Sequence, residues 1–159
     1  MNNYFFWAIF LAAGLLAAGC AGTQPVENQK ESEGMLITSR NLQEISGVEW
    51  RLTELKQDGR PIALIANTQV IFFCSFKGKV NGLATINRYF GNLSIQADGD
   101  LEGNQAFGMT RMAGPPDLMQ QEENYLTALA KVSRMYLKDS ELIMTTGDRS
   151  TVLKFKQGK

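Results

Sequence analysis

Few residues in this chain have side chains suited to chemistry. The 159 residues include no histidine, which excludes Ser-His-Asp and Cys-His catalysis and the commonest zinc sites. The two cysteines, Cys20 and Cys74, form no cluster that could replace the missing imidazoles. Glu122 falls on an otherwise apolar helical face, but no second carboxylate or base accompanies it as acid–base catalysis would require. These residues predict a protein that is not an enzyme.

A short acidic run is the next candidate for chemistry, because it could suggest a calcium site. Asp98, Asp100 and Glu102 surround Gly99, but the loop lacks the twelve-residue arrangement and the terminal Glu of an EF-hand. A solvated hairpin tip is therefore the favoured interpretation of the run. The glycine-containing stretch 103–108 has neither the lysine nor the strand-to-helix context of a phosphate-binding loop. We therefore expect no metal and no cofactor.

The N-terminal segment predicts where the protein is located. An uncharged apolar run from Tyr4 to Leu16 leads into small residues and then Cys20. The run is shorter than the roughly 20 residues that a helix needs to cross a bilayer, and it matches the apolar region of a cleavable signal. Asn2 and Asn3 stand where Lys or Arg is usual in such signals. A signal cut at another position, or a plain membrane anchor, are the alternatives.

The sequence Ala-Ala-Gly-Cys at residues 17–20 resembles the lipobox of bacterial lipoprotein signals. The resemblance implies that residues 1–19 are removed, that Cys20 carries a diacylglycerol thioether, and that its new amine is acylated. Several acyl chains together give stable membrane anchoring. Because Ala21 rather than Asp follows the cysteine, resemblance to sorted lipoproteins predicts a lipid anchor in the outer membrane, with the domain facing the periplasm.

Composition limits the partners and the number of domains. Lys and Arg together number 16, as do Asp and Glu, so no basic field exists to attract nucleic acid. Removing residues 1–19 leaves 140 of the 159 residues, enough for one domain with a core. Once Cys20 is lipidated, Cys74 has no second cysteine with which to form a disulfide. The apolar run 70–76 predicts a buried strand, in which Cys74 is a small core residue rather than a reactive thiol.

The remaining chain divides by composition. Residues 20–34 are too polar to pack and predict a flexible tether. Residues 35–47 form a lead-in segment that fits either a short strand or a turn of helix. The domain proper is predicted at residues 48–156. Its first residues, 48–52, alternate between apolar and polar side chains, which is typical of a sheet with one solvated face.

Turn residues predict a series of antiparallel hairpins. Asp58-Gly59 ends the first strand. We place the next turn at Gly78 rather than at Asn81-Gly82, and we interpret Gly82 as a bulge or close-contact point within a strand. Asp98-Gly99 is predicted as a further turn. Gly147-Asp148 separates the two strands of the last hairpin, which closes the domain.

One segment has helical rather than strand periodicity. After Pro115-Pro116 the apolar period changes to 3.6, with Asp117 as the expected N-cap. The residues that share one helical face are Leu118, Glu122, Tyr125, Leu129 and Val132. Many antiparallel strands with one long helix predict an α+β fold.

Three blocks of the sequence together resemble the META domain. They are Ile-Asn-Arg-Tyr-Phe-Gly at 86–91, Thr-Arg-Met-Ala-Gly at 110–114, and Glu122 three residues before Tyr125. The likeness extends from residue 48 to residue 155, and the family includes HslJ-like heat-inducible lipoproteins of bacterial envelopes. It implies a curved antiparallel sheet, a partial barrel, packed around one main helix.

The resemblance also marks particular residues, for which we expect structural roles. They are Trp50, Asn87, Gly91, Thr110, Met112, Ala113, Glu122 and Tyr125. We expect Glu122 to bond to the backbone, and Asn87 and Thr110 to satisfy backbone groups at strand ends. The family typically carries cysteines at the positions of Ile86 and Gly114. Both are missing here together, as expected if they pair in relatives, so any thiol role is in doubt for this chain.

Two functions from different classes remain open. One is an accessory or stress-related envelope lipoprotein that binds another protein. The other is binding of a small hydrophobic ligand, such as an acyl tail, or pilotin-like escort of an outer-membrane protein. Aromatic and methionine side chains could line such a ligand site or simply form the core; they are Phe72, Phe76, Tyr89, Phe90, Phe107, Tyr125 and Met135. An open pocket would favour the ligand, and a filled core beside an exposed apolar patch would favour the protein partner.

Overall fold

The computed structural model describes residues 34–102 and 106–158 of the chain. Residues 1–19, Cys20 and the tether as far as residue 33 lie outside the described residues. The strands are β1 (Met35–Leu36), β2 (Glu49–Gln57), β3 (Arg60–Ile62), β4 (Ile71–Cys74), β5 (Lys79–Leu83), β6 (Arg88–Asn92), β7 (Gly108–Met109), β8 (Arg134–Lys138), β9 (Glu141–Thr145) and β10 (Val152–Gln157). A short 3-10 helix, η2 (Leu42–Glu44), and one α-helix, α1 (Pro116–Ala130), complete the described chain.

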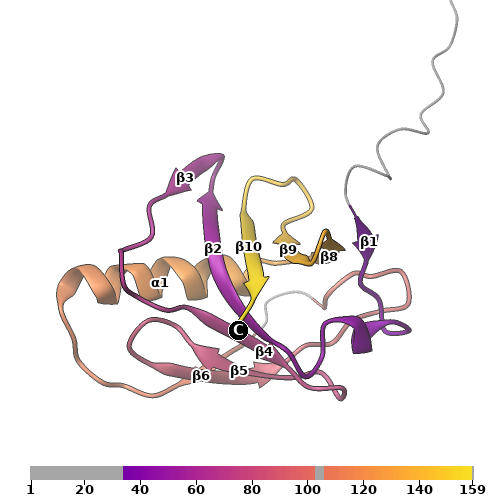
Figure 1. Ribbon diagram of the computed structural model, residues 1–159, viewed down its shortest axis with the longest axis horizontal. Helices are drawn as coiled ribbons and strands as arrows, with labels where there is room; N and C mark the ends of the chain where they lie inside the picture. Colours follow the sequence, from indigo (N-terminus) through magenta and orange to yellow (C-terminus); the bar gives the residue numbers. More distant parts are fainter. Residues whose placement is uncertain (1–33, 103–105, 159) are drawn as a thin grey trace, which may run out of the picture.

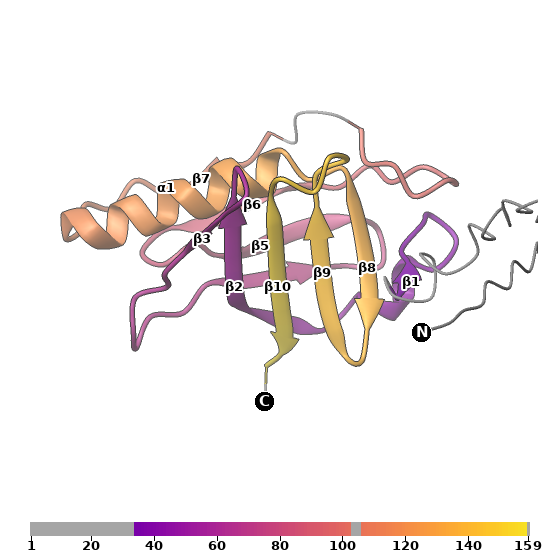
Figure 2. The same cartoon turned by 90° about the horizontal axis from the view of Figure 1, so that it is seen from above.

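All of these strands belong to one antiparallel sheet, in the order β1-β8-β9-β10-β2-β4-β5-β6-β7, with β3 beside β2. Strand β2 joins the two parts of the sheet. It pairs with β10 on one side, and on the other side with β4 through its first residues and with β3 through its last. The sheet therefore bends along β2 and curves around α1 without closing (Figures 1 and 2). This confirms the predicted α+β fold and partial barrel.

A loop links the two ends of the curved sheet. The turn predicted at Asp98-Gly99 is present, although only Ile95 and Leu101 form a bridge across it. Within this loop, Leu101 N donates to Ser133 O at 2.9 Å, next to β8. The side chains of Asp100 and Arg134 form an ion pair at 2.7 Å. The segment after β6 is thus bonded to the chain at β8, which lies next to β1, the opposite end of the strand order.

The lead-in segment contains both structures that its sequence allowed, a short strand and a turn of helix. Strand β1 pairs with β8, and η2 follows it. Ile37 and Ile45 are fully buried. Ile45 O accepts a hydrogen bond of 2.9 Å from Trp50 Nε1, the indole of a fully buried side chain. The lead-in segment therefore packs into the same core as the domain that follows it.

The helix fills the concave side of the sheet. Tyr125 of α1 lies between Tyr89 of β6 and Phe155 of β10, with ring centroids 5.7 and 6.4 Å apart respectively. These edge-on contacts are favourable geometries for aromatic rings. Tyr125 and Phe155 are fully buried and Tyr89 is 1% exposed. The ring cluster joins the helix to two strands on opposite sides of β2.

Two glycines lie where the sequence predicts them, whereas the helix N-cap is at a different residue. Gly78 occupies the β4–β5 turn with a φ of 74°, as predicted. Gly82 lies inside β5, where a Cβ atom would collide with Ile71 O and the Tyr89 ring, which confirms a close-contact glycine. The predicted N-cap was wrong. Pro115 is the N-cap and Asp117 lies in the first turn. The helix starts at Pro116, because a proline at the first helical position already has the required φ and no N–H to satisfy.

Candidate functional site

A buried carboxylate on α1 connects the helix to the first motif, the sequence block at residues 86–91. Glu122 is 2% exposed. Its Oε2 atom accepts hydrogen bonds from the backbone N–H groups of Ile86 at 3.2 Å and Asn87 at 2.7 Å, just before β6. Its Oε1 atom accepts from Asn87 Nδ2 at 2.8 Å. Charge-assisted bonds of this kind are stronger than neutral ones, so Glu122 fixes the chain that enters β6.

Asn87 extends this connection to the second motif, the sequence block at residues 110–114. It is 1% exposed, and its Nδ2 donates to Met112 O at 3.1 Å. Asn87 Oδ1 accepts from Met112 N at 2.7 Å and from Thr110 Oγ1 at 2.8 Å. Thr110 Oγ1 in turn accepts from Arg88 N at 3.1 Å. The three motif blocks therefore form one hydrogen-bonded network, which positions the segment between β7 and α1.

A tyrosine pair lies in the core beside this network. Tyr89 OH donates to Ile71 O at 3.0 Å, and the hydroxyl oxygens of Tyr89 and Tyr125 are 2.6 Å apart. Because Tyr89 has one hydroxyl proton, Tyr125 is the donor in the second bond. Burial raises the pKa of both phenols above the usual tyrosine value. These phenols remain neutral and serve as hydrogen-bonding groups of the core.

The other motif residues are not part of the network. Trp50 is buried in the core and bonded to Ile45 O. Gly91 lies beneath the Phe107 ring, where an added Cβ would come within 2.7 Å of a ring carbon. Ala113 is exposed. Cys20 lies outside the described residues.

Gln121 is a site residue that the sequence analysis missed. It is 4% exposed. Its Oε1 accepts from Ile65 N at 2.6 Å, while Nε2 donates to the hydroxyls of Thr68 and Thr85 at 2.9 and 3.0 Å. The available signal was its position four residues before Tyr125, which places both side chains on one helical face. Gln121 holds two loops against α1.

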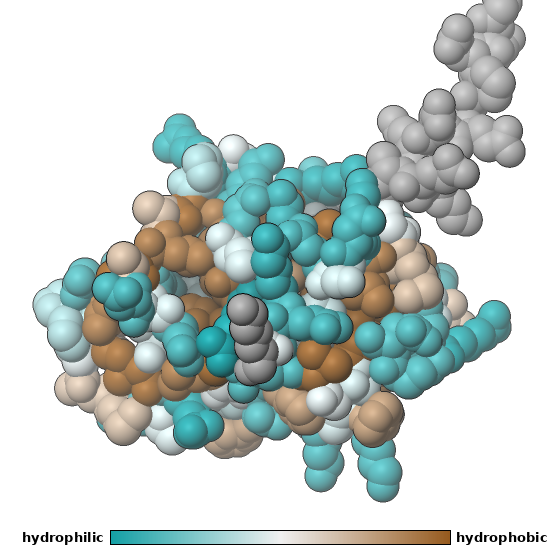
Figure 3. Space-filling model, in the orientation of Figure 1, coloured by the Kyte–Doolittle hydropathy of each residue, from teal (hydrophilic) through white to brown (hydrophobic). Residues whose placement is uncertain are grey.

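An open groove of about 530 Å³ runs along the outer side of α1. Its lining residues are Met109, Pro116, Met119, Gln120, Glu122, Glu123, Leu126 and Thr127. The lining is mostly apolar, and its two ionisable side chains are both carboxylates. Met109 at one wall is 38% exposed. Figure 3 shows hydrophobic side chains reaching the surface around α1.

The core beneath the groove is filled. Of the side chains that could have lined a ligand site, Phe72 and Tyr125 are fully buried, and Tyr89 and Met135 are each 1% exposed. Phe107 packs edge-on against Tyr89 with ring centroids 5.7 Å apart. These side chains are packed against one another as core. The remaining two, Phe76 and Phe90, are 70% and 59% exposed.

The thiol in the described chain is poorly placed for chemistry. Cys74 is fully buried, as predicted, and burial raises its pKa to about 11. A thiol is nucleophilic only as the thiolate, so Cys74 is inert in the folded domain. Among residues 34–102 and 106–158, no three Cys, Asp or Glu side chains are grouped so that they could hold a metal ion. No helix in these ranges is long and apolar enough to cross a membrane.

The fold and the network together define an α+β domain whose motif segments are joined through one buried glutamate. The sequence model of the META domain matches residues 42–159. The chain therefore belongs to the META domain family. A comparison with curated proteins gave no match.

Solved structures share this fold. An NMR structure of a protein from Burkholderia xenovorans has a TM-score of 0.62 at 18% identity, covering 91% of this chain and 99% of that one. A second NMR structure has a TM-score of 0.52 at 19% identity, covering 76% and 94%. A crystal structure of a DUF4847 family protein from Bacteroides vulgatus has a TM-score of 0.52 at 10% identity, covering 74% and 96%. At these identities the likeness concerns the fold alone.

Proposed function

We propose that this protein is an outer-membrane lipoprotein, anchored through Cys20, whose META domain faces the periplasm and binds a segment of another envelope protein without catalysis. The N-terminal pattern ending at Cys20 supports the anchor. The absence of histidine from the sequence and the buried, protonated state of Cys74 support a non-catalytic domain. A stress-related or accessory role agrees with the resemblance to HslJ-like lipoproteins.

The observation that carries partner binding is the methionine-walled groove beside a filled core. Methionine side chains are flexible and polarisable, so they adapt to apolar partner residues. Met109 and Met119 line the groove and are at least partly exposed. The groove is open rather than enclosed, which suits an entering side chain or helix face better than a sequestered lipid.

Charge indicates which kind of segment fits. Glu122 and Glu123 are the ionisable residues of the lining, and Glu123 is exposed. A partner segment that places apolar side chains on Met109 and Met119 and a Lys or Arg beside Glu123 would satisfy both features. A fatty acid would bring its own carboxylate toward these two carboxylates, where like charges repel.

The test is cross-linking of the lipidated protein in its native membranes, followed by purification of the adducts. Wild type is compared with Glu123→Lys, and with Glu44→Lys as a matched charge reversal at an exposed residue of η2. We expect one protein adduct that wild type and Glu44→Lys share and that Glu123→Lys loses about tenfold, as like-charge contacts predict. The isolated partner should then bind less tightly as salt increases.

Three outcomes would contradict the proposal. Equal recovery of every adduct from the two variants would remove the groove as the binding site. A small molecule that remains bound in native mass spectrometry and leaves on denaturation would favour the hydrophobic-ligand alternative. Unprocessed Met1, or a mature terminus without acyl mass, would exclude the anchor at Cys20.

A further inference from the structure

The outer face of strands β2, β4, β5 and β6 carries a second cluster of solvent-facing side chains, away from the groove. Cross-strand pairing places Glu49, Phe73, Asn81 and Phe90 in one row across the four strands. Arg51, Ile71, Leu83 and Arg88 form the next row. Directly opposite residues on antiparallel strands point to the same face of a sheet. We call these two rows the outer grid.

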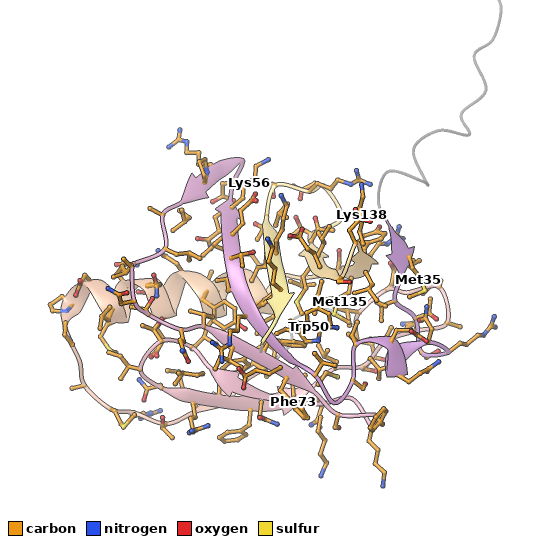
Figure 4. All side chains as sticks on the ribbon, viewed as in Figure 1. Met35, Trp50, Lys56, Phe73, Met135 and Lys138 are labelled. Carbon is orange, nitrogen blue, oxygen red and sulfur yellow. The ribbon has the colours of Figure 1, made fainter. Side chains whose placement is uncertain are left out.

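The outer grid faces away from the core. Trp50 and Phe72, which alternate with its members along β2 and β4, are fully buried. In Figure 4 Trp50 lies inside the molecule, whereas Phe73 lies below the strands on the outer side. Phe90 is 59% exposed. A depression of about 310 Å³ opens on this face, between Phe73, Leu83 and Arg88.

The charges of the grid are arranged in a particular order. Glu49 and Arg51 stand on the same strand, one in each row, and form an exposed ion pair at 3.0 Å. Arg88 carries a third charge, and no ion pair joins it to another residue of the described chain. Phe90 stands in the other row on the same strand as Arg88. On β2 and on β6, the residue in one row is therefore chemically complementary to the residue in the other row.

We propose that the outer grid binds a second copy of this chain about a two-fold axis that runs across the strands, midway between the rows. The rotation lays each row on the other row of the second copy. Glu49 then faces Arg51 of the second copy, and Phe73 faces Ile71. Phe90 faces the guanidinium of Arg88, a favourable cation–π arrangement. Only Asn81, which faces Leu83, meets an unlike chemistry.

The alternative symmetric arrangement is unfavourable. An axis parallel to the strands lays β2 of one copy on β6 of the other, so Arg51 would face Arg88 across the interface. Like charges in direct opposition are destabilising. The chemistry of the grid therefore selects one axis, and the two sheets pack face to face with aligned strands, a common geometry for sheet packing.

The size of the grid sets the strength of this dimer. The distance from β2 to β6 is about 14 Å at the usual strand spacing. A patch of that width covers less area than the roughly 800 Å² per partner of a standard interface. We therefore expect a weak dimer, best detected by trapping it rather than by its mass in dilute solution.

The experiment uses the full-length chain, expressed in cells, with Asn81→Cys and a short bismaleimide. Asn81 of one copy lies about 7 Å along the strands from Asn81 of the other, the distance between the rows. We expect an adduct of twice the chain mass. The same cysteine at Ala63, exposed in the loop after β3, is the matched control and should give no such adduct.

A charge swap then tests the axis. In the Asn81→Cys background, Glu49→Arg or Arg51→Glu alone should lower the yield of the doubled mass about tenfold, and the double swap should restore it. Breaking the exposed pair of Glu54 with Lys154 by Glu54→Arg controls for loss of a surface ion pair. An absent doubled mass, a yield that the double swap does not restore, or an adduct of a different mass would each overturn the proposal.

Discussion

The side chain of Ile86 occupies the space that a side chain at Gly114 would need. A Cβ atom at position 114 would overlap Ile86 Cδ1. These are the two positions where the META resemblance implies cysteines in other family members. In this chain the side chain of Ile86 packs directly over the backbone of Gly114.

Restoring both cysteines should therefore join the segment before β6 to the segment before α1. We expect Ile86→Cys with Gly114→Cys to form a disulfide under oxidising conditions, raising the free energy of unfolding by about 3 kcal/mol for a loop of this length. Urea unfolding with and without reductant measures the difference. Gly114→Cys alone should be destabilising because Ile86 still fills the site. Free thiols at both positions 86 and 114 in the oxidised double variant, besides the native Cys74, would show that the positions are not close enough to pair.

Glu122 should be essential to the stability of the domain through its hydrogen bonds. Glu122→Gln keeps the shape but replaces one acceptor oxygen by an NH₂ group, so at least one of the N–H donors at Ile86 or Asn87 loses its partner. We expect a loss of about 2–3 kcal/mol in unfolding free energy, the cost of unpaired buried groups. Glu123→Gln, next to it and exposed, should change stability by less than about 0.5 kcal/mol. Equal effects from the two variants would refute this role.

The tyrosine pair predicts an unequal response to loss of either hydroxyl. Tyr125→Phe removes only the bond donated to Tyr89 and should cost about 1 kcal/mol. Tyr89→Phe removes the bond to Ile71 O as well and leaves the fully buried Tyr125 hydroxyl without a partner. It should therefore cost about 2–3 kcal/mol. Chemical denaturation of the two variants measures the order, and the reverse order would mean that Tyr125 is not the donor.

The same pair predicts lower stability at alkaline pH. Burial raises the pKa of Tyr89 and Tyr125 in the folded chain, so the folded state keeps protons that the unfolded state releases near pH 10. Stability is therefore full below about pH 10 and falls above it, by up to about 1.4 kcal/mol per pH unit for each phenol. Denaturation between about pH 9 and pH 11 measures the slope. A variant with both residues changed to Phe should have a shallower slope, and an identical slope would assign the effect to other groups.

Local structure could be predicted from the sequence where a single pattern, such as strand alternation, determined it. The alternation around Trp50 predicted an inward-facing strand, and the crowded position of Gly82 followed from its place within a strand. Strand β8 was not predicted, because Met135 and its neighbour Tyr136 are both buried, which breaks the period of two. The N-cap was misplaced because proline and aspartate are both common at helix starts.

The candidate site was harder to predict than the fold. The position of Glu122 on an apolar helical face indicated burial, but its partners Ile86 and Asn87 are 36 and 35 residues away in sequence. Sequence spacing does not encode such distances. The methionine groove exists only once β7 lies beside α1, and the outer grid requires the register of four strands. Both depend on tertiary pairing that no local pattern specifies.

The pairing of β2 with β10 has a consequence for how the domain is made. Thr53 of β2 bonds to Lys154, which lies 101 residues later in the chain. The central strand is therefore paired along both edges only when the far C-terminal part of the chain is in place. Without that part, one edge of a nine-residue strand has no partner, and such edges template incorrect pairing. The sheet of this domain therefore cannot be completed before its C-terminal strand is available, and a chain that lacks that strand exposes the long edge of β2 to incorrect pairing.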